Sequence, residues 1–468
     1  MGSVLENIDL GRIDAESDER LADYFVETGA VGGVRSGKQL VLGRKGSGKT
    51  ALFVHIRDEF VDRTVDLELT DYFFTTHRKL REAGVAETNA YTSAWKLLIY
   101  LAAVGSVQEK MSSNQKSEFI QYLHELQMQD RRGGLHRMFD WLSRVKKLDF
   151  PSLANVATLG GVEVETAPQH PLEMQFVKVF LQFEKFALQI LKEFPRTVLI
   201  DRIDEAWDGS EEARLLIIGV VRAMRDINLQ VKGQGLATVI VFLRTDLWQQ
   251  IQFNDRNKIS QDIEHLDWSD GDLVKVIEAR IRSSAANREG EFNNWYSLFF
   301  DGEMRQRARS ETYMLKRTMG RPRDIVAFST FCLEGAKRAG HSIIEKEDIY
   351  SAEPRYCNHI IDELSDEIGS TVDDFQKVLK LVRALRKRNF FMDDWFKIAA
   401  AQHVSEQDAR SWLNLLFEAS VVGVFEIGGG GGGSRCTYRY QDPYVQPEED
   451  SHMQVHLAVA KALKLKDS

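Results

Sequence analysis

With 468 residues, 43% of them hydrophobic and 28% charged, the chain should form two to four soluble domains with ordinary cores. Its net charge of −9 argues against a protein that coats nucleic acid over its whole surface, but is compatible with a local basic patch. No apolar run approaches a membrane span, and the three cysteines are too widely spaced for a disulfide framework or a zinc cluster, so we expect a cytoplasmic protein without membrane contact.

Residues 1–39 are predicted to form a leader ahead of the first strand. Within it, the stretch 14–25 has the pattern of a short amphipathic helix, with Leu21, Tyr24 and Phe25 on one face. A helix of this kind usually packs on the edge of the domain that follows, and contact with the adenine ring of a nucleotide is an open alternative.

A phosphate-binding loop is indicated between a short apolar run and a helical pattern. The pattern G-x-x-x-x-G-K-[ST] is matched by Gly43, Arg44, Lys45, Gly46, Ser47, Gly48, Lys49 and Thr50. Apart from the arginine, these residues are our candidates for contacts with a nucleotide. Glycines let backbone N–H groups turn inward around phosphate oxygens, and the helix N-terminus adds further donors. Lys49 is expected to reach the β- and γ-phosphates, and the Thr50 hydroxyl to hold Mg²⁺.

The segment after the loop begins an α/β unit. Residues 51–61 continue as a helix, and residues 65–69 alternate between apolar and polar side chains as in a strand. Helical patterns then follow over 91–104, 117–128 and 173–193. This separation from the next expected strand is long for a minimal nucleotide-binding domain. We therefore predict a helical insertion over about 71–195, within an ATPase core that spans 40–269.

A second buried strand is predicted to end at Asp201, because apolar or β-branched residues occupy 197–200. A carboxylate at this position can hold Mg²⁺ opposite Thr50, if the two strand tips are adjacent in the sheet. Asp204 and Glu205 follow, and one of them can orient or deprotonate the attacking water. The plainer interpretation is that these two acids only begin a helix, where negative charge is favourable.

A further apolar run over 237–243 predicts a strand that ends at Arg244. Ligands of parallel sheets bind at the carboxyl ends of the strands, so this arginine is expected beside the phosphate loop, where it can sense a γ-phosphate. An ordinary arginine at a strand end is the alternative. A short strand over 262–266 completes the predicted core.

From residue 270 onward the strand signals stop, and helical patterns predict a lid over 270–370. The stretch Gly320-Arg321-Pro322-Arg323 opens one of these helices, and Arg321 and Arg323 can fold back over the phosphates. Proline at the first helical position, with both arginines facing solvent, is an equally good explanation of the same stretch.

The last part of the chain combines three helical patterns with two strand patterns around the glycine run 428–433. This order predicts a winged-helix domain over 371–446, followed by a C-terminal tail over 447–468. The first of its helices is basic through Lys377, Lys380, Arg383, Arg386, Lys387 and Arg388. Acids nearly balance the unit as a whole, so DNA binding and a merely solvated face both remain open.

These motifs resemble the AAA+/STAND branch of P-loop ATPases. The pattern Asp201-x-x-Asp204-Glu205 is similar to the second motif of NACHT and KAP NTPases, although Arg202 stands where those families often have a small residue. Arg244 falls where those families place an arginine at the first sensor, and Gly320-Arg321-Pro322-Arg323 is similar to the lid arginine motif of AAA+ proteins. The leader and the phosphate loop also resemble bacterial antiviral-defence ATPases.

The resemblance implies an α/β P-loop NTPase core with a parallel sheet and a helical insertion, then a helical lid and a winged-helix domain. It further implies an ATPase that uses ATP and Mg²⁺ as a switch, controlling homo-oligomerisation or a separate effector protein, with antiphage defence as a setting. Two alternatives stay open. One is a DNA-binding loader that resembles origin-recognition ATPases, and the other is a nucleotide-stabilised scaffold that does not hydrolyse.

Overall fold

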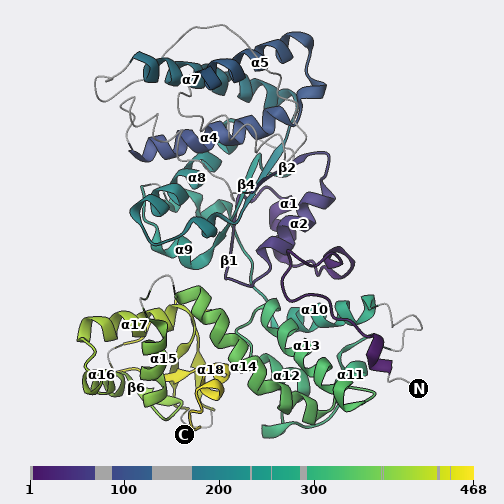
Figure 1. The fold of residues 1–468 in the computed structure, drawn as a ribbon, viewed down its shortest axis with the longest axis vertical. Helices are drawn as coiled ribbons and strands as arrows, with labels where there is room; N and C mark the ends of the chain where they lie inside the picture. Colours follow the sequence, from purple (N-terminus) through teal and green to yellow (C-terminus); the bar gives the residue numbers. More distant parts are fainter. Residues whose placement is uncertain are drawn as a thin grey trace. The chain divides into compact units, whose positions relative to one another are not determined.

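The structure is a computed structural model, and it describes residues 4–68, 87–128, 171–231, 235–254, 256–284, 292–369, 372, 374–428, 433–442, 444–448 and 450–467. The chain divides into two compact units (Figure 1). The sheet unit comprises Glu27–Arg44 and Lys49–Leu266. The lid unit comprises Met1–Val26, Lys45–Gly48 and Asp267–Ser468.

The sheet unit is built around a five-stranded parallel sheet in the order β2-β3-β4-β1-β5. Its strands are β1 (Leu40–Gly43), β2 (Thr64–Glu68), β3 (Thr197–Asp201), β4 (Val239–Arg244) and β5 (Ile263–His265). The three central strands are buried almost throughout, which explains their continuous apolar sequences. The chain therefore has the predicted α/β P-loop fold.

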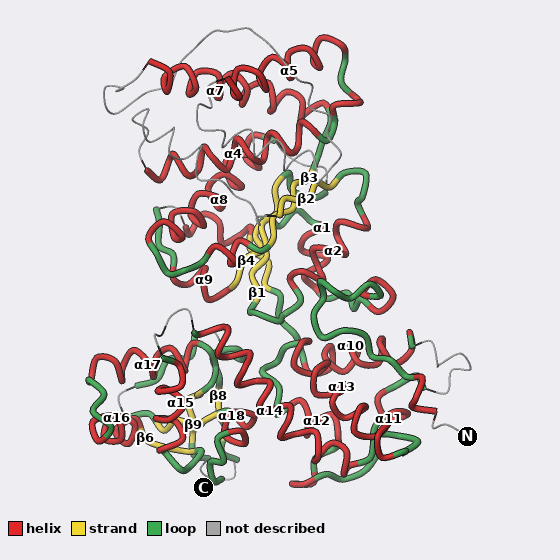
Figure 2. The backbone as a smooth tube through the Cα atoms, viewed as in Figure 1, coloured by secondary structure: helices red, strands yellow, loops and turns green. Residues whose placement is uncertain are grey.

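Helices cover the sheet and form the predicted insertion (Figure 2). They are α1 (Gly29–Arg35), α2 (Lys49–Glu59), α4 (Glu87–Gly105), α5 (Ser113–Met128), α7 (Pro171–Glu193), α8 (Glu211–Gln230) and α9 (Thr245–Gln250). Helix α4 packs closely on α8, because a Cβ at Gly219 would lie 2.8 Å from the Cβ of Tyr91. The Trp95 indole also donates a hydrogen bond to the Leu216 carbonyl. The predicted insertion extends beyond the described residues at 69–86 and 129–170.

The leader differs from its prediction. Residues 14–25 form turns and the short 3₁₀ helix η2 (Leu21–Tyr24) instead of an amphipathic helix, and the 3₁₀ helix η1 (Val4–Asn7) precedes them. The side chain of Asp14 accepts hydrogen bonds from the Ser17 amide and hydroxyl, and such local bonds compete with a helix. Both 3₁₀ helices pack against lid helices, so the expectation that the leader lies on the core was wrong for residues 4–26.

After Asp267, the described part of the lid unit contains the α-helices α10 (Asp270–Ser283), α11 (Trp295–Leu298), α12 (Ser310–Leu315), α13 (Pro322–Ala339) and α14 (Lys346–Ile368). Helix α13 lies between α10 and α14 by its contacts, and its apolar face is the centre of the unit's core. Pro322 stands at the first position of α13, where its missing N–H is not needed.

The remaining elements follow the order helix, strand, helix, helix and hairpin, and a further strand and helix come after the hairpin. They are α15 (Phe375–Ala384), β6 (Asn389–Phe391), α16 (Met392–Ala401), α17 (Glu406–Glu418), β7 (Val422–Glu426), β8 (Arg435–Thr437), β9 (His452–Val455) and α18 (Leu457–Ala462). The four strands form an antiparallel sheet in the order β6-β9-β7-β8. Up to β8, the described elements follow the order expected of a winged helix. The assignment of a winged-helix domain stays a prediction.

The predicted C-terminal tail over 447–468 is wrong. Strand β9 pairs with both β6 and β7, and α18 packs against α14. A strand of four residues is too short for a periodic pattern to reveal, and its partners are distant in sequence. The predicted lid and winged-helix regions also belong to one compact unit by their contacts. Within the described residues, no helix has the length and apolar character that a membrane crossing requires.

Candidate functional site

The phosphate loop joins the end of β1 to the start of α2. Gly46 and Gly48 have φ angles of 77° and 93°, a region that side chains disfavour, so the local turn requires glycine. The Ser47 hydroxyl oxygen is buried and has no hydrogen-bond partner in the structure. A buried polar atom without a partner is costly, and its presence in this loop fits a site that binds a polar ligand.

Lys49 is buried in the sheet unit, with 9% of its surface exposed. Its ammonium donates hydrogen bonds to the carbonyls of Gly43 and Arg44, at 3.2 and 3.3 Å. Burial lowers the pKa of Lys49, and the nearby carboxylates of Asp204 and Asp201 oppose that shift. An ammonium has three donors, so one remains for an anionic ligand beside this loop.

The two predicted magnesium ligands lie together. The Thr50 hydroxyl donates a hydrogen bond to a carboxylate oxygen of Asp201 at 3.0 Å. Asp201 ends β3 and is 3% exposed, and burial raises its pKa. One detail was wrong, because β4 lies between β1 and β3 and the two strand tips are not adjacent. The described residues contain no group of three His, Cys, Asp or Glu side chains suited to a metal, so Mg²⁺ here would also need phosphate and water oxygens.

The acids after β3 sit on the short helix η4 (Ile203–Ala206). Arg202, which precedes it, has a φ of 59°, an uncommon backbone state that turns the chain sharply after Asp201. Asp204 has a carboxylate oxygen 3.8 Å from the Arg244 guanidinium, whereas Glu205 is exposed. Asp204 is therefore in contact with the predicted sensor arginine.

Arg244 lies beside the phosphate loop, as expected. Its backbone is in register with Gly43 of β1, which pairs with β4. Its guanidinium donates two hydrogen bonds to the carboxylate of Asp246, at 3.0 and 2.7 Å. Sequence reasoning missed this acid, although its position two residues after the arginine was visible. Asp246 fixes the arginine's orientation.

The two lid arginines occupy different environments within the lid unit. Arg321 is 1% exposed, and it bonds to Asp324, Glu367 and the Lys45 carbonyl. Its guanidinium is thus engaged by acids and by the loop backbone. Arg323 is partly exposed, with an ion pair to Glu363 at 3.1 Å.

Arg323 also packs on the loop. Its backbone N–H points to the Gly46 carbonyl at 3.4 Å, and a Cβ at Gly46 would lie 3.1 Å from the Cβ of Arg323. Gly46 is therefore needed for both its φ and this close approach. Of the two arginines, Arg323 remains the candidate for a phosphate contact.

Trp268 is a loop contact that the sequence did not reveal. Its indole N–H donates to the Ser47 carbonyl at 2.7 Å, within the lid unit. Trp268 stands three residues after the end of β5, and nothing in the neighbouring sequence marks it as part of a site. Trp268, Arg321 and Arg323 together contact the carbonyls of three successive loop residues.

A comparison with known protein families matched part of the chain. The model described as the FunZ-associated C-terminal helical domain matches residues 271–365, which fall in the lid unit. The putative transposon gamma-delta 80.3 kDa protein of Escherichia coli (strain K12) is 21% identical over 395 residues. That alignment covers 80% of this chain and 54% of the relative, so the chain spans about half of the relative's length.

Two solved structures are similar over nearly the whole chain. Cdc6p from Pyrobaculum aerophilum has a TM-score of 0.30 and 10% identity, with 99% of this chain and 98% of that chain covered. The ORC2 protein of Aeropyrum pernix, in ADPNP–ADP complexes, has a TM-score of 0.40 and 11% identity, with 96% of each chain covered. The fold assignment rests on the strand order and phosphate loop of this chain itself.

Proposed function

We propose that this chain is a Mg²⁺-dependent ATPase whose nucleotide state controls its assembly or a separate effector protein. The observation that carries the proposal is the hydrogen bond between Thr50 and Asp201, with the buried ammonium of Lys49 beside the same loop. Loop, hydroxyl and strand-end carboxylate are the parts that a P-loop ATPase uses to hold phosphates and their metal. When bound, Mg²⁺ would neutralise charge on the phosphate oxygens.

The chain's own residues divide the remaining tasks. Lys49 would bind the β- and γ-phosphates, and Thr50 and Asp201 would hold the metal. Glu205 or Asp204 would orient a water and accept its proton, and Arg244, fixed by Asp246, would sense the γ-phosphate. These roles are assigned from position and chemistry.

Contacts between the phosphate loop and residues of the lid unit support the proposal that nucleotide state acts as a switch. The carbonyls of Lys45, Gly46 and Ser47 each meet a residue of the lid unit, while Gly43 and Lys49 belong to the sheet unit. A change in loop conformation must therefore move or break contacts with lid residues. This gives nucleotide occupancy a physical route to the lid helices.

The direct test is ATP hydrolysis by the purified chain. Phosphate release should require Mg²⁺ and fall to background with a chelator, and the size-exclusion profile should differ between ATP and ADP. If calorimetry detects no ATP binding with Mg²⁺ present, the proposed function is wrong.

The antiphage setting rests on the resemblance of the leader and loop to bacterial antiviral-defence ATPases. Phage plating on cells with wild-type protein or the Lys49→Ala variant tests it.

A second test addresses the loop contact of Trp268. Replacement by Phe keeps the ring but removes the N–H that bonds to the Ser47 carbonyl. We expect ATP affinity to fall about two- to ten-fold, the equivalent of one hydrogen bond of about 0.5–1.5 kcal/mol. Trp412→Phe, at a half-buried tryptophan of α17, is the matched control and should leave ATP affinity unchanged. Equal affinities for wild type and Trp268→Phe would show that this contact does not support the loop.

The second candidate function is a DNA-associated ATPase. It is favoured by a group of exposed basic residues on and after α15 and at the end of the chain, which are Lys380, Arg383, Arg386, Lys387, Lys464 and Lys466. The matched relative is itself named as a putative transposon protein. Under this candidate, nucleotide state would control DNA contact in place of, or together with, a protein effector.

A further inference from the structure

Helix α15 carries its charge on one side only. Its apolar residues are buried, whereas Lys377, Lys380 and Arg383 are exposed at intervals of three residues. At a rise of about 1.5 Å per residue, successive cations are about 4.5 Å apart along the helix axis. Two further exposed cations, Arg386 and Lys387, follow directly after the helix.

The end of the chain brings more cations to the same place. The amide of Arg388 donates to the Lys466 carbonyl at 2.9 Å, and the amide of Lys466 donates to the Arg386 carbonyl at 3.0 Å. Lys387 and Lys466 are therefore opposite each other in a parallel bridge. Lys464, two residues earlier, is also exposed. The supposed tail is thus fixed beside the turn that follows α15.

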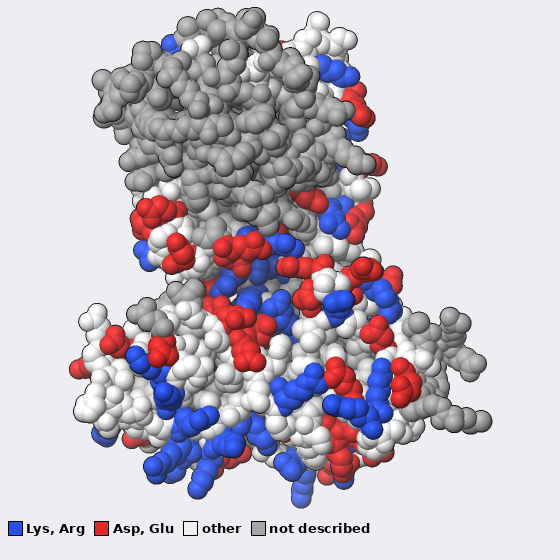
Figure 3. All heavy atoms as spheres, viewed as in Figure 1, with Lys and Arg blue, Asp and Glu red and all other residues white. Residues whose placement is uncertain are grey.

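We call these residues the basic surface: Lys380, Arg383, Arg386, Lys387, Lys464 and Lys466. Among the described residues, none of the six has an ion pair with a carboxylate, unlike Lys377, which pairs with Asp374. At its edge, Asp467 has a carboxylate oxygen 4.0 Å from Arg388, which is not one of the six. Figure 3 shows Lys and Arg side chains gathered over the C-terminal part of the lid unit. Six unpaired cations in a chain of net charge −9 indicate a polyanionic partner.

The features of the basic surface favour duplex DNA among polyanions. A membrane-binding helix exposes apolar residues that enter the lipid, but Val378, Leu379, Leu381 and Val382 of α15 are all buried. Single strands are held by stacking on aromatic side chains, and the exposed aromatic ring that follows α15 in sequence, Phe391, is already stacked on His452. Lysines and arginines alone are what the phosphate backbone of a duplex requires.

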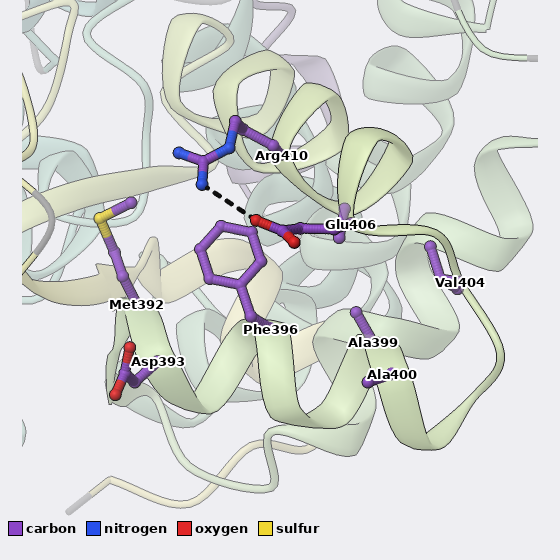
Figure 4. A pocket seen from close by; sticks show the side chains of 9 residues that line it. Met392, Asp393, Phe396, Ala399, Ala400, Val404, Glu406 and Arg410 are labelled. Atoms are coloured by element: carbon purple, nitrogen blue, oxygen red, sulfur yellow. Dashed lines mark hydrogen bonds and ion pairs between the residues drawn. The ribbon is translucent and has the colours of Figure 1, made fainter.

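The helix that would read bases in a winged helix is not basic. The exposed side chains of α17 are Glu406, Gln407, Asp408, Arg410, Ser411 and Asn414. Its arginine is turned toward Glu406 and lies over the Phe396 ring, as Figure 4 shows. Next to it, a cavity of about 390 Å³ between α16 and α17 is lined mainly by apolar residues and two acids.

We propose that the basic surface binds the phosphate backbone of duplex DNA, without base reading and without α17. The proposal locates the DNA contact of the second candidate function, and it does not depend on ATP hydrolysis. It places the contact on the first helix of the C-terminal domain and on the last residues of the chain.

The test is the salt dependence of binding to a fluorescent duplex of mixed sequence, measured by anisotropy with the full chain. Two variants reverse charge on the basic surface, Lys380→Glu/Arg383→Glu and Lys464→Glu/Lys466→Glu. The control is Lys397→Glu/Arg410→Glu, which makes the same charge change on α16 and α17. Between about 50 and 200 mM salt, each surface variant should bind at least about ten-fold more weakly than wild type, with a salt slope shallower by about two.

The control variant should stay within about two-fold of wild type, and thermal melting should show that all variants are folded. The proposal is overturned if the control variant loses as much DNA affinity as the surface variants. It is also overturned if wild-type DNA binding does not depend on salt concentration. So does preference for single strands or for anionic vesicles over the duplex. ATP hydrolysis measured without DNA separates this outcome from failure of the proposed ATPase, since the surface variants should hydrolyse ATP normally.

Discussion

The Lys49→Ala variant should bind ATP at least about a hundred-fold more weakly than wild type and release no phosphate above background. The reason is the position of the ammonium, buried at the end of β1 with a donor to spare. Hydrogen bonds from a charged donor contribute about 1.5–3 kcal/mol each, and a hundred-fold loss corresponds to about 2.8 kcal/mol. Calorimetry with ATP and Mg²⁺ measures the loss of affinity.

Two further variants make this prediction specific. Arg57→Ala changes a cation at the other end of α2, where it pairs with Asp58, and should bind ATP like wild type. Lys49→Met keeps the length of the side chain and its apolar stem, so it tests the charge even if the alanine variant is unstable. Wild-type affinity in a folded Lys49 variant would remove the assignment of the loop.

Local chemistry made the core of the site predictable. The loop needs glycine at Gly46 and Gly48 because of their positive φ angles, and such positions leave a recognisable spacing in the sequence. Asp201 was predictable because a buried strand ends there, and a carboxylate at such an end has few structural uses. The side chains of Thr50 and Asp201 lie within hydrogen-bond distance, although the strand order that brings them there was not predicted.

Contacts between distant segments could not be predicted. A buried strand is apolar on both faces, so its composition does not say that β4 separates β1 from β3. The same holds for Trp268, whose role is one hydrogen bond to a carbonyl over 200 residues away in sequence. Strand β9 and the bridge at Lys466 are too short to carry a pattern. The sequence shows the basic helix, but the basic surface as a whole is visible only in the folded chain, because two of its six residues, Lys464 and Lys466, come from a segment that looked like a tail.

The Glu205→Gln variant should keep its ATP affinity within about three-fold and lose phosphate release by at least about a hundred-fold. An amide has the size of the carboxylate but cannot accept the proton of a water, and general-base catalysis typically contributes about 10²–10⁴ in rate. The structure places Glu205 exposed on η4, four residues after Asp201. Single-turnover hydrolysis, measured beside calorimetric ATP affinity, separates the loss of chemistry from a loss of binding.

Comparison with Asp204→Asn assigns the role between the two acids. Asp204 is the acid with an ion pair to Arg244, so its replacement should disturb the sensor arginine as well as any proton transfer. Glu212→Gln, in the first turn of α8, is the control for an exposed acid and should hydrolyse ATP normally. If Glu205→Gln is active, Glu205 is not the base; Asp204 is then assigned as the base if Asp204→Asn keeps its ATP affinity and loses hydrolysis. If wild type binds ATP but releases no phosphate even with duplex DNA and a partner, hydrolysis is ruled out as its activity, and the nucleotide-stabilised scaffold becomes the better account of the site.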